Sequence, residues 1–421
     1  MDSHARTDFF RSLFPYRWVP NAGQWRRQPI EHTKDYCLAV IEFDDQGWFQ
    51  DFRQRDALER FLNQKANQNE DLLIVVFIHG WQHNADPDDI SLLSFRSVLH
   101  QACISESNRR SRQILGVYLS WRGLSLSGND ALMAASFWTR KKAATHVALG
   151  CVREILARLR AFQAARNQSK DLQGRDVGTH LIVAGHSFGG LILFTAVCEY
   201  LIESVILCNS EKHIVEPFGD LIVLINPAFE AARYLPLYSV ASQSVYPKNQ
   251  RPCFLAVTST NDYATRYAFP IARWFNALLE SVRPFRGIMG EITPPVDAEG
   301  KAILNTMGHL PWLITHRLSC PKTGQSAHQP YEGKGVDWNK ERQAFNEFNQ
   351  RFRRDGHLEK NWKRTYSSGA ILEHIRGNPD NPFWTIQATP EVVDGHGGIY
   401  RPVFLDFLRQ VVDDRLQPIA R

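Results

Sequence analysis

The sequence of 421 residues lacks most features of a disulfide-stapled or exported protein. Its seven cysteines are an odd number, are widely scattered and mostly lie inside apolar runs, where a thiol behaves as a small hydrophobic side chain. We therefore expect reduced cysteines, which favours a cytoplasmic location. No apolar segment follows the first residues, so we expect no secretory signal peptide, and signal-independent secretion stays open.

A strong excess of one charge is also lacking. Lysine and arginine together number 49, against 44 acidic residues. The short basic runs at 109–112 and 351–354 are better explained as solvated helix ends or loops than as phosphate-binding surfaces. We therefore expect no nucleic-acid partner. Apolar runs are interrupted before the roughly 20 residues that a bilayer span needs, so we also expect no membrane span.

Metal-binding motifs are missing although the chain has 15 histidines. There is neither a His-Glu-x-x-His sequence nor a paired-cysteine zinc spacing. His79 and His83 are four residues apart, but they straddle the end of a predicted strand instead of sharing one helix face. The sequence thus predicts no metal and no other cofactor.

The composition, 43% hydrophobic and 22% charged, is that of a globular protein with a substantial core. Short β-branched runs alternate with longer amphipathic segments, a pattern typical of βα units around a largely parallel sheet. We therefore predict the α/β class. The expected strands are 36–43, 72–78, 114–120, 180–184, 221–225, 253–258 and 383–388. The expected helices are 55–66, 90–102, 137–165, 189–201, 269–281 and 402–412.

One large domain, residues 36–421, is expected after an irregular N-terminal arm, residues 1–35. The arm carries several aromatic side chains that we expect to dock on the body, with a partner surface as the alternative. These are Phe9, Phe10, Phe14, Tyr16, Trp18 and Trp25. Residues 283–380 break the βα rhythm and contain one predicted helix, 339–353. We expect this stretch to be a lid-like insertion packed over the sheet's edge.

The strongest local motif is Gly185-His186-Ser187-Phe188-Gly189, which follows an apolar strand and precedes an apolar helix. A Gly-x-Ser-x-Gly elbow needs this strand-turn-helix context. The glycines relieve crowding in a sharp turn, and the helix directs its positive end at the Ser187 oxygen. We predict Ser187 to be a nucleophile, with a glycine-rich turn and an incidental serine as the alternative.

A second motif, His79-Gly80-Trp81, follows the predicted strand 72–78. A tetrahedral intermediate carries an oxyanion, which two backbone N–H groups can stabilise. Our candidates for this oxyanion hole are the amides of Phe188 and Trp81. We expect His79 to order its loop by hydrogen bonding and not to act as a base. We interpret His83 and His186 in the same way.

A serine hydroxyl needs a general base that is held by a carboxylate. Asp262 lies just beyond the predicted strand 253–258, at the sheet edge where catalytic groups of open α/β sheets collect. It is the predicted acid, and Glu230 is the reserve candidate. His396 lies in a glycine-rich loop after the strand 383–388 and is the predicted base. His309 and His316 are the less favoured alternatives for the base.

From about residue 36 onward the chain resembles the α/β-hydrolase superfamily, on the elbow, the upstream His-Gly-Trp loop and the order serine, acid, histidine. The resemblance implies Ser187 as nucleophile, Asp262 as acid and His396 as base. The segments 116–123 and 261–265 are similar to a bacterial esterase or lipase-like subgroup. The insertion between acid and base departs from the family, because it is not where the usual cap domain lies.

We therefore expect a serine hydrolase that cleaves carboxylic esters of small molecules or lipids through an acyl-enzyme. Amide or thioester hydrolysis would use the same residues. A lipase or phospholipase, including a secreted lipolytic effector, is favoured by aromatic residues, namely Trp81, Phe137, Trp138, Trp274, Phe275 and Trp312. A non-catalytic α/β-hydrolase-like binding protein is the alternative from another class. The sequence leaves the acyl group, the alcohol and the oligomeric state open.

Overall fold

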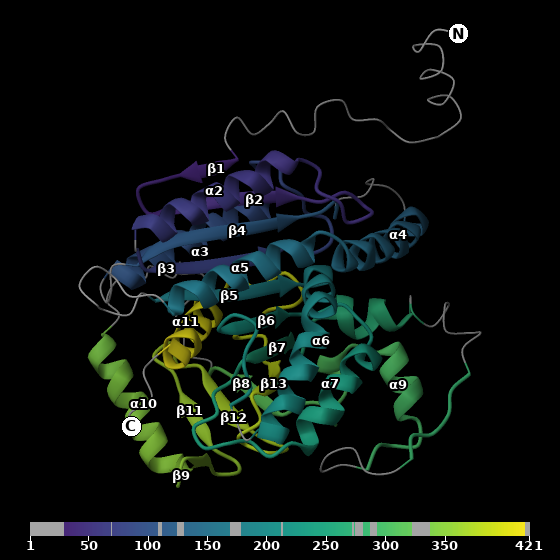
Figure 1. Ribbon diagram of the computed structural model, residues 1–421. Helices are drawn as coiled ribbons and strands as arrows, with labels where there is room; N and C mark the ends of the chain where they lie inside the picture. The colour runs from purple at the N-terminus through teal and green to yellow at the C-terminus, as the bar shows by residue number, and fades with distance from the viewer. Residues whose placement is uncertain are drawn as a thin grey trace.

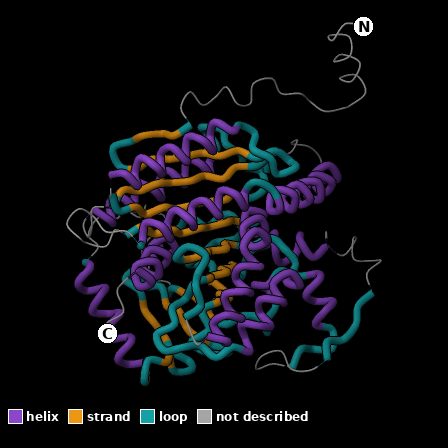
Figure 2. The backbone as a smooth tube through the Cα atoms, viewed as in Figure 1, coloured by secondary structure: helices purple, strands orange, loops and turns teal. Residues whose placement is uncertain are grey.

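The structure is a computed structural model that describes part of the chain (Figures 1 and 2). The described residues are 29–68, 70–107, 112–123, 130–168, 178–211, 214–271, 273, 281–286, 293–321 and 337–416. Four predicted features lie partly or wholly outside them. These are the arm up to residue 28 with its aromatics, residues 109–111 of one basic run, residues 272 and 274–280 of the helix predicted at 269–281, and residues 287–292 and 322–336 of the insertion.

An eleven-stranded sheet forms the centre of the molecule, in the order β1-β2-β4-β3-β5-β6-β7-β13-β8-β12-β11. The strands from β2 to β8 in this order pair in parallel, and antiparallel strands complete both edges. The predicted α/β class is thus confirmed. The strands are β1 Ile30–His32, β2 Tyr36–Glu42, β3 Leu72–Ile78, β4 Gln113–Ser120, β5 Thr179–His186, β6 Leu221–Ile225, β7 Phe254–Ser259, β8 His316–Ser319, β11 Lys363–Thr365, β12 Ile371–His374 and β13 Phe383–Ala388.

Helices cover both faces of the sheet, so the central strands are buried on two sides (Figure 1). This double burial explains why β3 and β6 are continuous apolar runs instead of alternating ones. One core lies under α2 Phe52–Gln68, α4 Asp130–Leu149, α5 Val152–Asn167, α6 Phe188–Glu211, α7 Ala231–Gln243 and α9 Ala298–Leu304. The other lies under α3 Ile90–Ser107, α10 Trp338–Phe352 and α11 Pro402–Leu416.

Three helix predictions need correction, the first being that of one helix in the insertion, which contains α9 as well as α10. The single helix expected at 137–165 is two helices, α4 and α5, because the chain turns at Gly150 against the loop before α2. A Cβ atom on Gly150 would lie 2.4 Å from the Gly47 carbonyl oxygen, and the Cys151 amide donates to that same oxygen at 2.7 Å. Helix α7 was not predicted, since it contains Pro236, a residue that ordinarily ends helices.

The insertion does not pack over the sheet's edge as expected. Its strand β8 pairs with β13, and β12 and β11 follow, so the insertion extends the sheet. These strands have only three or four residues, too short for a readable hydrophobic period. The separate hairpin of β9 Arg353–Arg354 and β10 His357–Leu358 follows α10. A 3-10 turn, Met307–His309, precedes β8.

One helix contradicts the expectation that every apolar run is too short to span a bilayer. Residues Phe188–Asn209 of α6 are long and apolar enough by length and composition alone. Half of that window is buried inside the molecule, and the helix contributes residues from Phe188 to Cys208 to the core. A core helix of this kind passes the same test as a membrane span, so the finding is weak evidence for one.

Candidate functional site

Ser187 lies at the sharp turn between β5 and α6, with a left-handed backbone φ of 56°. Such a φ is uncommon for a residue other than glycine, and strained residues cluster at functional sites. The flanking glycines have no room for a side chain. A Cβ on Gly185 would lie 2.6 Å from the Gly189 oxygen, and one on Gly189 would lie 2.0 Å from the Ile78 oxygen. The turn thus depends on glycine at both positions.

The structure brings Ser187, His396 and Asp262 together from three loops at the carboxyl ends of parallel strands. His396 Nε2 lies 2.8 Å from Ser187 Oγ, and His396 Nδ1 lies 2.9 Å from Asp262 Oδ2. With a carboxylate at Nδ1, the imidazole carries its proton there, and Nε2 accepts from the Ser187 hydroxyl. The three side chains therefore have the geometry of a nucleophile, a base and an orienting acid.

Asp262 is fully buried and remains the charged partner of His396. Its Oδ1 accepts from the Thr265 amide at 3.1 Å, and its Oδ2 accepts from the Thr265 hydroxyl at 2.6 Å. Burial alone would raise the pKa of Asp262, but the hydrogen bonds from His396 and Thr265 outweigh it and hold the pKa below its usual value. The site thus keeps an ionised carboxylate behind the imidazole.

Glu230, the reserve acid, has different partners. Its carboxylate forms an ion pair with the buried Lys141 and also contacts Arg233 and Arg273. Burial would raise the pKa of Glu230, yet Lys141 lowers it below its usual value. The structure therefore places Glu230 in an ion-pair cluster, whereas Asp262 holds His396.

The loop that carries His396 is fixed through its backbone. Asn226, fully buried just after β6, donates its amide protons to the carbonyls of His396 at 2.9 Å and Gly395 at 3.0 Å. Its side-chain oxygen accepts from the Ser259 amide at 2.9 Å. Sequence reasoning missed Asn226, and its only signal was its place directly after a strand at the active edge of the sheet.

His186 supports the same carbonyl from the elbow side, since its Nε2 donates to His396 O at 2.9 Å. Burial, with a smaller contribution from His396, lowers the pKa of His186 to about 3. His186 is therefore neutral at physiological pH and can serve as a single fixed donor. This agrees with the hydrogen-bonding role expected from the sequence.

His79 orders the loop after β3, as expected. Its Nδ1 donates to Gly80 O at 2.8 Å, and its Nε2 accepts from the Trp121 amide at 3.1 Å and lies 3.0 Å from Ser120 Oγ. Burial lowers the pKa of His79 to about 4, so the ring is neutral. His83, the other histidine of this loop, pairs with Asp89.

The loop after β3 lies directly against the nucleophile. A Cβ on Gly80 would lie 2.9 Å from the Cβ of Ser187. Among the described loops and turns, no backbone carbonyl accepts from the Trp81 amide, and Phe188 is the first residue of α6, so its amide has no acceptor within that helix. Both amides are available for an oxyanion, although their role stays a prediction.

Aromatic rings cluster around Phe137, and two of them, Trp81 and Phe188, follow Gly80 and Ser187 directly in the sequence. Phe137 of α4 lies 5.1 Å from Phe188, 5.8 Å from Trp81 and 6.2 Å from Phe269, measured between ring centroids. We call Trp81, Phe137, Phe188 and Phe269 the aromatic wall. Trp312 packs instead on Tyr238 in the core, and Trp274 and Phe275 lie outside the described residues. The wall thus includes the residue next to Ser187 and the residue next to Gly80.

The less favoured histidines lie elsewhere. His316 in β8 is buried between the rings of Trp362 and Trp384. His309 does not contact Ser187 or His396, but it lies 2.9 Å from Thr265 Oγ1. Within the described ranges, no group of three His, Cys, Asp or Glu side chains has the arrangement of a metal site.

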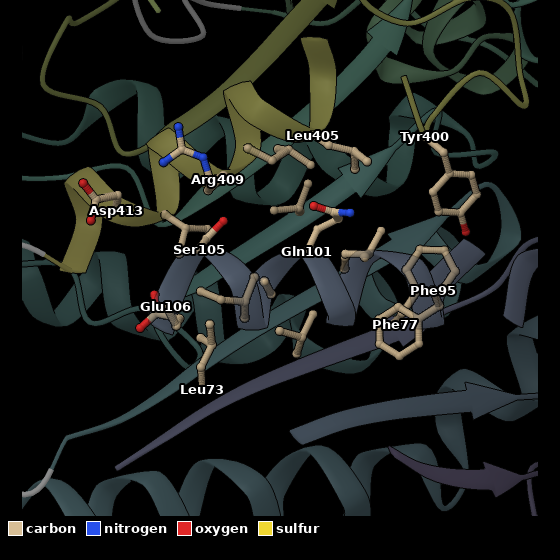
Figure 3. Close-up of a pocket in the computed structure, with 18 of the residues that line it drawn as sticks. Leu73, Phe77, Phe95, Gln101, Ser105, Glu106, Tyr400, Leu405, Arg409 and Asp413 are labelled. Carbon is tan, nitrogen blue, oxygen red and sulfur yellow. The ribbon is translucent and has the colours of Figure 1, made fainter. Parts of the chain in front are cut away.

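An apolar cavity of about 180 Å³ lies between α3, α11 and the sheet. Figure 3 shows Phe77, Phe95 and Tyr400 at one end and Glu106, Arg409 and Asp413 at the other. Its lining includes none of Ser187, Asp262 and His396. The cavity is thus separate from the candidate active site.

Comparison with protein families identifies the family of this chain. A model of the alpha/beta hydrolase family matches residues 75–368, a range that includes Ser187 and Asp262 and ends before His396. No curated protein matches the chain. A crystal structure of an uncharacterized protein from Pseudomonas aeruginosa matches with 11% identity and a TM-score of 0.23, over 61% of this chain and 44% of that one. The chain thus spans less than half the length of that protein.

Proposed function

Because this chain belongs to the alpha/beta hydrolase family, we propose that it is a serine hydrolase that cleaves carboxylic esters through an acyl-enzyme. The observation that carries the proposal is the pair of contacts made by His396, 2.8 Å to Ser187 Oγ and 2.9 Å to Asp262 Oδ2. A binding protein without catalysis has no need of this alignment.

The reaction begins when Ser187 Oγ attacks the ester carbonyl carbon and His396 Nε2 takes the hydroxyl proton. Asp262 stabilises the imidazolium that forms. The amides of Trp81 and Phe188 donate to the oxyanion of the tetrahedral intermediate. His396 then protonates the leaving alkoxide, and the carbonyl carbon stays bonded to Ser187 as an acyl ester.

Water completes the cycle by the same steps. His396 removes a proton from water as its oxygen attacks the acyl carbon, and a second tetrahedral intermediate forms. The imidazolium returns the proton to Ser187 Oγ as the acid product leaves. The free enzyme is thus regenerated with no net change in protonation of its own groups.

The aromatic wall favours esters with an apolar group beside the scissile bond. Turnover of p-nitrophenyl esters of graded acyl length and labelling by an active-site fluorophosphonate test the proposal. We expect both to occur and both to be lost in Ser187→Ala. Ser97→Ala, at an exposed serine of α3, serves as the matched control and should behave as wild type. Absence of turnover and of Ser187-dependent labelling would instead support a non-catalytic binding protein.

Lipid esters are a second candidate because of an exposed apolar ridge next to the acid. Tyr263, Tyr267 and Ile271 are spaced by four residues and are 70%, 47% and 62% exposed. Phe269, from the same segment, belongs to the aromatic wall. A lipid aggregate could therefore contact the ridge while one of its chains approaches Ser187.

Vesicle assays separate the two candidates. Replacing all three ridge residues by serine should lower hydrolysis of phosphatidylcholine vesicles several-fold and leave hydrolysis of a soluble acetate ester near wild type. Val245→Ser, at a residue that is 81% exposed outside the ridge, is the control. Wild-type activity on vesicles that does not exceed activity on soluble short esters argues against a lipase.

A further inference from the structure

The Thr265 hydroxyl lies between two groups that compete for its single proton. Asp262 Oδ2 is 2.6 Å away and His309 Nε2 is 2.9 Å away. An ionised carboxylate is the stronger acceptor and has no proton to give. The hydroxyl therefore donates to Asp262, and its oxygen accepts from His309 only if the histidine carries its proton on Nε2.

The surroundings of His309 keep its ring neutral. Burial lowers the pKa of His309 to about 4, against an opposing effect of Asp262 and a smaller lowering by Arg266. Asp262 and Arg266 are thus the charged groups that face His309. Asp262 itself faces His396 and Thr265 and, at longer range, His186. A neutral imidazole has one N–H, which the Thr265 oxygen can accept. No second cation is thus placed beside the carboxylate.

His309 is held in place by the segment around it. A Cβ on Gly308 would lie 2.0 Å from Thr258 Oγ1, so glycine lets this turn pack on β7. The Ala231 amide donates to Asn305 O at 2.8 Å, and Thr306 bridges to Glu230. The turn is therefore fixed between the loops that follow β6 and β7, and the insertion reaches the acid of the site.

We propose that Thr265 and His309 are positioning residues for Asp262, forming the chain His309–Thr265–Asp262–His396–Ser187. His309 fixes the direction of the Thr265 hydroxyl, and Thr265 holds the ionised carboxylate in line with His396 Nδ1. The insertion thus takes part in the reaction through a hydrogen bond. This inference rests on the proposed serine hydrolase function.

Four variants test this hydrogen-bond chain. Thr265→Val keeps the shape and removes the donor, and His309→Phe removes the ring N–H. His309→Gln restores an N–H donor near the position of Nε2. His357→Phe is the control, since His357 also belongs to the insertion and contacts a carboxylate, Asp380, but lies in the separate β9–β10 hairpin.

Thr265→Val and His309→Phe should each lower kcat about tenfold, with KM nearly unchanged. The acid limb of the kcat/KM profile should move to higher pH, because a carboxylate with one donor fewer holds the imidazolium proton more strongly. His309→Gln should return to within about threefold of wild type, and His357→Phe should match wild type. Equal losses in His309→Phe and His309→Gln, or an unchanged kcat and pH profile in His309→Phe, would overturn the proposal.

Proton NMR of the protein without substrate tests the hydrogen-bond chain independently of ester hydrolysis. The Nδ1 proton that His396 shares with Asp262 gives a downfield proton NMR signal, which should shift in Thr265→Val and His309→Phe and not in His357→Phe. If wild type hydrolyses no ester but the NMR signal shifts in the two variants, the proposed function is wrong and the hydrogen-bond chain is supported. If esters are hydrolysed and the NMR signal does not shift in either variant, the hydrogen-bond chain is wrong and the proposed function is supported.

Discussion

Gly80 leaves no room for a side chain next to Ser187, because a Cβ atom on Gly80 would lie 2.9 Å from the Cβ of Ser187 and 3.0 Å from His186 Nδ1. Such contacts are too short for any side chain. The Gly80 position therefore brings the loop after β3 against Ser187.

Replacing Gly80 by alanine should push this loop away from Ser187. We expect kcat/KM to fall at least tenfold, since loss of one oxyanion donor costs on the order of 3 kcal/mol in the barrier. Steady-state kinetics on a p-nitrophenyl ester and thermal melting measure the effect. Gly178→Ala is the control, because its nearest neighbour would be 3.6 Å from the new Cβ. An active Gly80→Ala protein would contradict the role given to this loop.

Asn226 offers a test of how the His396 loop is held. Asn226→Ala removes the donors to Gly395 O and His396 O and also places a methyl group at a left-handed φ of 45°. We expect a loss of about 2–4 kcal/mol in the free energy of unfolding, at roughly 1–3 kcal/mol per buried unpaired group. kcat should fall more than KM rises, because the imidazole loses its position.

Asn226→Gly separates backbone strain from the lost hydrogen bonds. Glycine tolerates positive φ, so this variant should regain stability relative to Asn226→Ala only to the extent that strain contributes. Its kcat should stay as low as that of Asn226→Ala. Recovery of kcat in the glycine variant would show that the hydrogen bonds do not position His396. Urea denaturation and steady-state kinetics distinguish the cases.

Two buried neutral histidines should make the fold sensitive to acid. Their pKa values in the folded chain are lowered, to about 3 for His186 and about 4 for His79, below the unfolded value of about 6.5. Between these limits the unfolded chain binds more protons, so stability falls as pH drops below about 6.5 and is unaffected above it. Each histidine contributes at most about 1.4 kcal/mol per pH unit.

Urea denaturation of wild type and His79→Asn between pH 7.5 and 4.5 measures this effect. The variant should be less stable at pH 7.5, since it disturbs the contacts with Gly80 and Trp121. Its stability should also decline less steeply on acidification. An identical slope in both proteins would mean that His79 titrates alike in the folded and unfolded chains.

The sequence was sufficient for the central strands and for choosing the three residues Ser187, Asp262 and His396, whose side chains the structure brings into contact. Strands β3 and β6 have the bounds that their apolar runs predicted, because strands buried on both faces leave a continuous hydrophobic signal. Strand β13, which includes Thr385 and Gln387, also has its predicted bounds. The Gly-x-Ser-x-Gly turn also has a local signal, since its conformation depends on the glycines beside Ser187.

Features that arise from contacts between distant segments were not predictable. The break between α4 and α5 depends on a contact with Gly47, about a hundred residues upstream of Gly150. The residues near 150 are therefore not sufficient to predict it. The contacts of Asn226 with the His396 loop span 170 residues. Thr265 and His309 meet only because the turn before β8 packs on β7. Such pairings need the sheet order, which periodicity does not supply.

Asp262 and Glu230, the two candidates for the acid that orients His396, should respond differently to loss of their charge. Asp262→Asn should lower kcat by roughly 10³–10⁴, because an amide at this place favours the wrong tautomer of His396. Glu230→Gln removes the charge that faces the buried Lys141. Removing one partner of a buried pair typically costs about 3–5 kcal/mol in stability, since the other charge stays buried.

Glu230→Gln should therefore melt at a lower temperature yet keep the shape of the wild-type pH–rate profile at a temperature where it is folded. Asp262→Asn should show the reverse, with a small change in melting temperature at neutral pH and a collapse of kcat. Since the pKa of Asp262 is lowered by folding, its carboxylate stabilises the fold above about pH 4 and this contribution is lost as pH falls through the folded pKa. The stability difference between wild type and Asp262→Asn should thus shrink on acidification. If Glu230→Gln instead abolished turnover while Asp262→Asn retained it, Glu230 would be the acid and the contact between Asp262 and His396 would be structural.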